Sequence, residues 1–152
     1  MRNKLFLVAM LCLALLVTAG CGGGSTFKRV SGLSSEQVVH NFFDAAKGNR
    51  MNEAASYVSP ASTGNTRTVL KFVTGQSSSS IQNYNLLSVK KVAVQGNYAA
   101  VVATMQQQNS ISLTIKPVGL EKIDNEWYIV DYDQVFRDAK YQVLAQLFRT
   151  IQ

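Results

Sequence analysis

The stretch LEKIDNEWYIV, residues 120–130, decides how the second half of the chain folds. Apolar and polar side chains alternate on both sides of Asp124-Asn125, and a period of two predicts β-strands. Asn tolerates the positive φ that a two-residue hairpin turn requires. The stretch therefore predicts a β-hairpin that pairs Leu120 with Ile129 and places Trp127 in the core.

The alternation continues upstream and predicts further strands. Between residues 84 and 94 the apolar positions change parity at Lys90-Lys91, which indicates a β-bulge there. Gln95-Gly96-Asn97 predicts a hairpin turn, and residues 98–105 are apolar on both parities, as in a strand covered on both faces. Residues 111–116 alternate again. Together with the hairpin, these segments predict a four-stranded antiparallel sheet.

Helices are predicted before the sheet. Ser34 is the expected N-cap of the first one, and Gln37 completes a capping box. Apolar residues then recur at i, i+3, i+4 and i+7 until Gly48, the expected end of an amphipathic, core-facing helix. A second helix is predicted over residues 52–59, and a third, short one over residues 69–73.

The C-terminus predicts one long amphipathic helix, from about residue 134 to residue 151, with Asp133 as its N-cap. Its apolar stripe is too wide to be left in water. Three destinations are open: the chain's own sheet, a second copy of the chain, and the membrane surface. The chain's own sheet is favoured, because the connection is short and the second face of strand 126–131 needs cover.

The N-terminus has the pattern of a secretory signal. Arg2 and Lys4 precede an uninterrupted apolar run, Leu5–Val17, which small residues follow. As a helix this run rises about 20 Å, short of the ~30 Å hydrocarbon core, so a permanent transmembrane span is disfavoured. We therefore expect residues 1–20 to be a signal peptide that is removed.

The stretch Val17-Thr18-Ala19-Gly20-Cys21 resembles a bacterial lipobox, in which the Cys is acylated and becomes the new N-terminus. Residues 21–32 are then the lipidated Cys and a flexible linker, and residues 33–152 a single domain. The resemblance implies a palmitate-bearing membrane lipoprotein that faces the extracytoplasmic side. Gly22, in place of Asp, favours the outer membrane where the cell has one. The alternative is an ordinary signal cleavage that leaves a free thiol.

Charge and cysteine content exclude several classes of function. The chain has 15 Lys+Arg against 9 Asp+Glu and one His, for a formal charge of +6. Because the basic residues are scattered, nucleic-acid binding finds no support. Lys28 and Arg29 lie within reach of anionic head groups, where they affect orientation only. Cys12 is lost with the signal, so no cysteine is left for a disulfide or a zinc site, and no metal or cofactor motif is present.

Few residues are candidates for chemistry. His40 is the only His, and its position beside the apolar stripe predicts a solvated or boundary residue. Asp131 shares strand parity with Trp127 and is a candidate for the mouth of a cavity, although a solvated carboxylate at the strand end is favoured. Tyr57 and Tyr84 are further cavity candidates and are expected at the core boundary with their hydroxyls outward. No acid/base pair is convincing, so we expect no enzyme.

The order of these elements resembles the cystatin-like α+β roll. It is similar in particular to small bacterial lipoproteins of unknown function in the nuclear-transport-factor-2-like (NTF2-like) superfamily. Residues 33–59 and 86–131 carry the resemblance, and the hairpin into Trp127 is its most recognisable part. It implies N-terminal helices packed on a curved sheet around a conical cavity, which relatives use for steroid or polyketide chemistry, peptide binding or dimerisation. The C-terminal helix is an addition to the usual pattern.

Two classes of function remain. The first, which we favour, is a binding or assembly module of the cell envelope: it is held to the membrane through acylated Cys21 and engages an unknown envelope protein through its sheet face, cavity or C-terminal helix. The second is a protein or enzyme that binds a small ligand in the cavity of the roll. No cofactor is expected, and a homo-oligomer is compatible with both classes.

Overall fold

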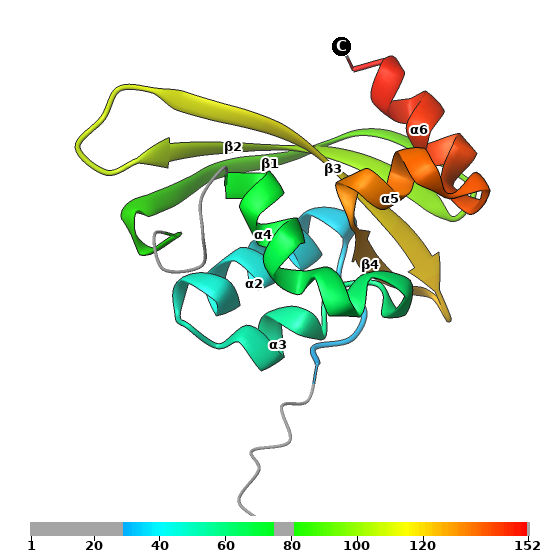
Figure 1. The fold of residues 1–152 in the computed structure, drawn as a ribbon, viewed down its shortest axis with the longest axis horizontal. Coiled ribbons are helices and arrows are strands. Elements are labelled where there is room, and N and C mark those ends of the chain that lie inside the picture. The colour runs from blue at the N-terminus through cyan, green and yellow to red at the C-terminus, as the bar shows by residue number, and fades with distance from the viewer. Residues whose placement is uncertain (1–28, 75–80, 152) are drawn as a thin grey trace, which may run out of the picture.

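The computed structural model describes residues 29–74 and 81–151. Its centre is one antiparallel sheet in which each strand pairs with the next along the chain. The strands are β1 (Tyr84–Gln95), β2 (Tyr98–Gln107), β3 (Leu113–Ile123) and β4 (Glu126–Val130). Helices lie on both faces of this sheet (Figure 1). An α+β fold with helices packed on a four-stranded antiparallel sheet, and with an added C-terminal helical segment, is thus confirmed.

The hairpin of β3 and β4 has the predicted register. Leu120 pairs with Ile129 and Lys122 with Trp127. Both turn residues have positive φ, 49° at Asp124 and 66° at Asn125. This is the backbone conformation that matches the twist of the two strands. Trp127, however, is only partly buried: it contacts the core from its edge, and Lys122 lies over its ring at 5.5 Å from the centroid.

The irregularities of β1 flank the predicted position. The pairing with β2 shifts between Leu86 and Ser88 and again between Lys91 and Ala93, so Leu87 and Val92 are the extra residues. The prediction of one bulge at Lys90-Lys91 was therefore wrong in number and place. Each bulge moves the side chains that follow it to the opposite face of the sheet. The pattern of apolar residues shows only the combined effect of the bulges in a strand, so two bulges a few residues apart are hard to separate.

Three helices cover one face of the sheet: α2 (Ser35–Lys47), α3 (Met51–Ala55) and α4 (Thr66–Thr74). Ser34 and Gln37 form the predicted capping box, and Gly48 is the C-cap. Short 3₁₀ turns, η1 (Pro60–Asn65) and η2 (Ile81–Asn83), complete the helical layer. The main core lies between this layer and the sheet, and its largest fully buried residues include Phe42, Phe43, Leu70, Ile81, Met105, Leu120 and Ile129.

The second helix ends at Ala55, earlier than the predicted Ser59. The reason is a tertiary contact, because the next residues pair with the sheet. The Ile129 N–H donates to the Tyr57 carbonyl at 2.8 Å, and the Ser59 N–H donates to the Ile129 carbonyl at 2.8 Å. The Tyr57–Ser59 segment thus hydrogen-bonds the free edge of β4, which would otherwise expose unpaired backbone groups.

The C-terminal segment covers part of the outer face, the face opposite α2. It consists of α5 (Tyr132–Arg137), η3 (Ala139–Tyr141) and α6 (Gln142–Arg149). Docking on the chain's own sheet, the favoured destination, is confirmed by a second core, which contains Ala100, Val130, Val135, Tyr141, Leu144, Leu147 and Phe148. The prediction of one continuous helix was wrong, because Asp138 is extended and caps η3. The N-cap of α5 is Asp131 and not Asp133.

Gly119 makes the docking of α6 possible. A Cβ atom at this position would lie 2.6 Å from Leu144 Cδ2 and 3.0 Å from Phe148 Cζ, both in the second core. Contacts this short force neighbouring side chains to move, and interiors as dense as protein cores resist that. The missing side chain of Gly119 therefore lets α6 approach β3 closely.

Candidate functional site

Cys21 lies outside the described residues, so the lipid anchor stays a prediction. The first described residue, Arg29, is bound to β4. Its guanidinium forms an ion pair with Glu126 at 3.0 Å and donates to the Trp127 carbonyl. It also lies over the Tyr128 ring, 4.2 Å from the centroid. These contacts, with the Gly32 N–H that donates to Glu126 at 2.8 Å, join the start of the domain to β4. Arg29 is therefore not free to contact lipid head groups.

Part of the outer sheet face is left open by α6. In the register of the sheet, Ser88, Thr104 and Ile115 lie side by side, as do Lys90, Val102 and Pro117. Leu113 follows on the same face of β3, and the bulge residue Leu87 lies next to Ser88 on β1. We call this surface, made of Leu87, Ser88, Lys90, Val102, Thr104, Leu113, Ile115 and Pro117, the open sheet face.

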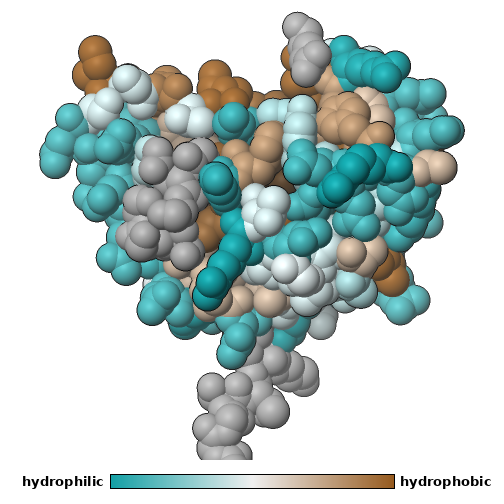
Figure 2. Space-filling view, viewed as in Figure 1, coloured by the Kyte–Doolittle hydropathy of each residue, from teal (hydrophilic) through white to brown (hydrophobic). Residues whose placement is uncertain are grey.

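The open sheet face is rich in exposed aliphatic side chains. Leu87 is 50% exposed, Leu113 55% and Ile115 62%, and Ile111 at the nearby hairpin tip is 96% exposed. Hydrophobic surface gathers along the upper edge of the molecule, over the β2–β3 hairpin (Figure 2). Contiguous exposed apolar surface of this kind marks interaction sites in soluble domains.

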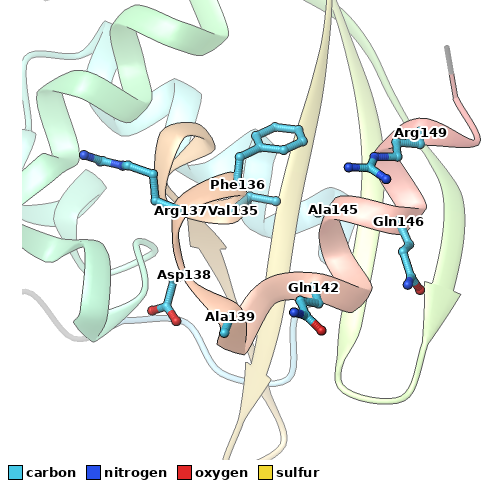
Figure 3. Close-up of a pocket in the computed structure, with 9 residues that line it drawn as sticks. All are labelled: Val135, Phe136, Arg137, Asp138, Ala139, Gln142, Ala145, Gln146 and Arg149. Atoms are coloured by element: carbon cyan, nitrogen blue, oxygen red, sulfur yellow. The ribbon is translucent and has the colours of Figure 1, made fainter.

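The break in the C-terminal segment creates a groove of about 540 Å³ between α5 and α6. Phe136 and Arg149 point toward one another across it, whereas Arg137 points away (Figure 3). Asp138, Ala139, Gln142, Ala145 and Gln146 also line the groove. Its rim is basic and polar, and Phe136 is its one exposed large apolar side chain among the described residues. Of the two surfaces formed on this side, the open sheet face is the more apolar.

The prediction that Asp131 is a solvated carboxylate at the strand end is wrong. It is 1% exposed, and its Oδ1 accepts the Gln134 N–H at 3.2 Å as the N-cap of α5. Its backbone N–H donates to Ser62 Oγ at 3.1 Å. No described residue donates to its Oδ2. Asp131 lines a pocket of about 380 Å³, above the ~300 Å³ at which ligand pockets begin, together with Thr68, Lys71, Phe72, Lys116, Tyr132 and Asp133.

The other candidates lie elsewhere. His40 is exposed on α2, as predicted. Tyr57 is 1% exposed and Tyr84 6% exposed, so both are buried in the main core, and neither lines the Asp131 pocket. The expectation that their hydroxyls face outward is wrong for Tyr57, whose oxygen accepts a bond from Asn41 Nδ2 at 3.4 Å. These three residues do not come together with Asp131.

A second buried carboxylate, Glu121 on β3, was not anticipated. It is 3% exposed and accepts hydrogen bonds from the Ser59 hydroxyl and, at 2.9 Å, from the Tyr141 hydroxyl. Lys140 Nζ is 2.6 Å from its other oxygen. The hydrogen bond to Glu121 raises the pKa of the Lys140 ammonium, and burial raises the pKa of the Tyr141 hydroxyl. We call Ser59, Glu121, Lys140 and Tyr141 the Glu121 cluster.

The Glu121 cluster is an element of structure. It joins residues from three parts of the chain: the segment after α3, the sheet and η3. Both oxygens of its buried carboxylate are paired with donors of the same chain, and these contacts tie the three segments together. The one indication of Glu121 in the sequence is its position two residues after Gly119, which places both residues on the outer face of β3. That signal alone did not predict burial.

Two structural features are absent from residues 29–74 and 81–151. No group of three or more His, Cys, Asp or Glu side chains there could hold a metal ion. No helix within these ranges is both long and apolar enough to cross a membrane. Neither family models nor curated proteins give a match to this sequence.

Proposed function

We propose that the protein is a lipoprotein of the bacterial cell envelope with a cystatin-like, NTF2-like domain, and that it acts as a binding or assembly module. The observation that carries the proposal is the open sheet face: the domain covers only part of its outer face with α5 and α6 and leaves aliphatic side chains of β1 and β3 exposed. A protein partner of the envelope with a complementary apolar surface would cover them.

The position of Arg29 supports an orientation in which the open sheet face points away from the anchor. The eight peptide units from Cys21 to Arg29 span at most about 29 Å, so an anchored domain stays close to the membrane. Arg29 is held by β4, and the chain enters beside α2, below the sheet in Figure 1. The β2–β3 hairpin and the outer face lie on the opposite side (Figure 1). An anchored protein would therefore present the open sheet face away from its anchor.

Cys21→Ser tests the anchor. The variant cannot be acylated, so we expect it in the soluble fraction, or uncleaved with its signal still present, whereas the wild-type protein partitions with membranes. Cell fractionation and the mass of the purified chain measure both outcomes. Normal processing together with unchanged membrane association would contradict the lipoprotein assignment.

Leu113→Asp combined with Ile115→Asp tests the partner surface. Both positions are more than half exposed, so the fold should keep its stability to within about 0.5 kcal/mol. A charge in an apolar interface is costly, so we expect cross-linking in cells to trap an envelope partner with the full-length wild-type protein and not with this variant. Asn52→Asp with Asn65→Asp, exposed positions on α3 and η1, is the matched control and should keep the complex. A complex that survives the β3 substitutions contradicts the proposal.

A further inference from the structure

The Asp131 pocket lies apart from the open sheet face and has a composition of its own. Lys116 belongs to the inner face of β3, since it pairs with Ala103 of the main core. Its Nζ lies over Phe72 of α4, 5.2 Å from the ring centroid. Phe72 in turn stacks on Tyr132 with centroids 3.9 Å apart and an interplanar angle of 15°. Two stacked rings and a lysine stem therefore form one side of the pocket.

The charged groups of the pocket balance one another in number and do not pair with one another. Lys71 and Lys116 contribute two ammonium groups, and Asp131 and Asp133 two carboxylates. Among the described residues, none of these four groups forms an ion pair within 4 Å. Charges that could neutralise each other thus remain separate around a space of about 380 Å³. A ligand with both signs of charge and no net charge is the one that such a lining complements.

The buried carboxylate of Asp131 indicates how a ligand would be oriented in the pocket. Asp131 is 1% exposed, and its Oδ1 already caps α5, whereas its Oδ2 has no donor among the described residues. A buried carboxylate oxygen without a hydrogen bond is costly, and most such atoms in proteins have a partner. An N–H donor of a ligand, above all a charged one, would supply that partner.

We propose that this pocket binds a small zwitterion of the α-amino acid class with an apolar side chain. The ligand ammonium donates to Oδ2 of Asp131, the ligand carboxylate pairs with Lys71 and Lys116, and the side chain lies against Phe72 and Tyr132. The site does not depend on the open sheet face or on the anchor, so it stands or falls separately from the proposed function.

The test is isothermal titration of the full-length protein in mild detergent with phenylalanine and with leucine. Two blocked forms of phenylalanine separate the charges: N-acetylphenylalanine lacks the ammonium, and phenylalanine amide lacks the carboxylate. We expect saturable binding of at least one free amino acid. We also expect each blocked form of phenylalanine to bind about tenfold or more weakly than phenylalanine itself. No saturable binding of either amino acid up to about 10 mM would overturn the proposal, as would equal binding of the N-acetylated form.

Substitutions locate the site. Asp131→Asn keeps the size of the side chain and an N-cap of equal quality, so the variant should fold, and circular dichroism with a thermal melt verifies this. We expect a loss of about tenfold or more in affinity. Lys116→Gln should weaken binding of the free amino acid and leave binding of its amide unchanged. Asp44→Asn, on the exposed face of α2, is the control and should bind as the wild type does. Equal affinity in a folded Asp131→Asn variant would overturn the assignment.

Discussion

Removal of residues 138–152 should lower the free energy of unfolding by about 5 kcal/mol or more, which is comparable with the whole stability of an ordinary domain. The deletion takes away η3 and α6, and with them Tyr141, Leu144 and Phe148, each at most 2% exposed. It exposes Val130 and Ala100 of the second core to water. It also leaves the buried Glu121 without the Tyr141 hydroxyl and the Lys140 ammonium.

Denaturant titration of the full-length and shortened proteins measures this loss, and sedimentation shows whether the newly exposed sheet causes association. Gln146→Ala is the matched control, because Gln146 lies on the exposed side of α6 and should cost less than about 0.5 kcal/mol. A shortened domain that stays monomeric and equally stable would mean that the C-terminal segment adds nothing to the fold. It would then be a recognition element, and the search for a partner should begin there.

Glu121→Ala should cost about 2–4 kcal/mol of stability. The carboxylate accepts two hydroxyl hydrogen bonds at a site that water barely reaches, and Ala would leave both the Ser59 and Tyr141 hydroxyls without this acceptor. The ion pair with Lys140 contributes less than its 2.6 Å distance suggests, because the lysine side chain is 48% exposed and its charge is screened by solvent.

Chemical denaturation of Glu121→Ala and Glu121→Gln separates the two contributions. Gln keeps an acceptor oxygen for the two hydroxyls, and its NH2 group replaces the charged oxygen that pairs with Lys140, so it should retain more of the stability than Ala does. Glu53→Ala is the comparison, because its carboxylate pairs with the half-exposed Arg50 at the start of α3, and we expect a far smaller loss there. If Glu121→Ala costs no more than Glu53→Ala, the Glu121 cluster does not hold the C-terminal segment.

Much of the fold could be predicted from the sequence, because it depends on interactions between residues close together in the chain. The capping box of Ser34 and Gln37 satisfies backbone groups within one turn, so the start of α2 needs no tertiary information. The same holds for the Asp124-Asn125 turn, whose two residues accept positive φ and thereby set the register of β3 against β4. Even the docking of the C-terminal segment followed from its apolar stripe and its short connection.

The candidate sites could be predicted only in part from local patterns in the sequence. The sequence alone singled out Asp131 by strand parity, but it had no means of linking this carboxylate to Lys71 and Lys116, which come from a helix and another strand. The sequence also suggested that Trp127 would be central, whereas its place at the end of a short edge hairpin leaves it partly exposed. Burial depends on what covers a residue, and that is a property of distant segments.

The sequence by itself thus determined the order of helices and strands, the Asp124-Asn125 turn, the register of β3 against β4 and the class of fold, because neighbouring residues along the chain supply those forces. Only the tertiary structure decided where the C-terminal helix breaks, which part of the outer face stays open, and that Glu121 and Asp131 are both buried. The chain is extended at Asp138, and the helix that follows, α6, lies against Gly119 with Leu144 and Phe148. Such outcomes depend on contacts between residues far apart in the chain, whose partners no local pattern of side chains identifies.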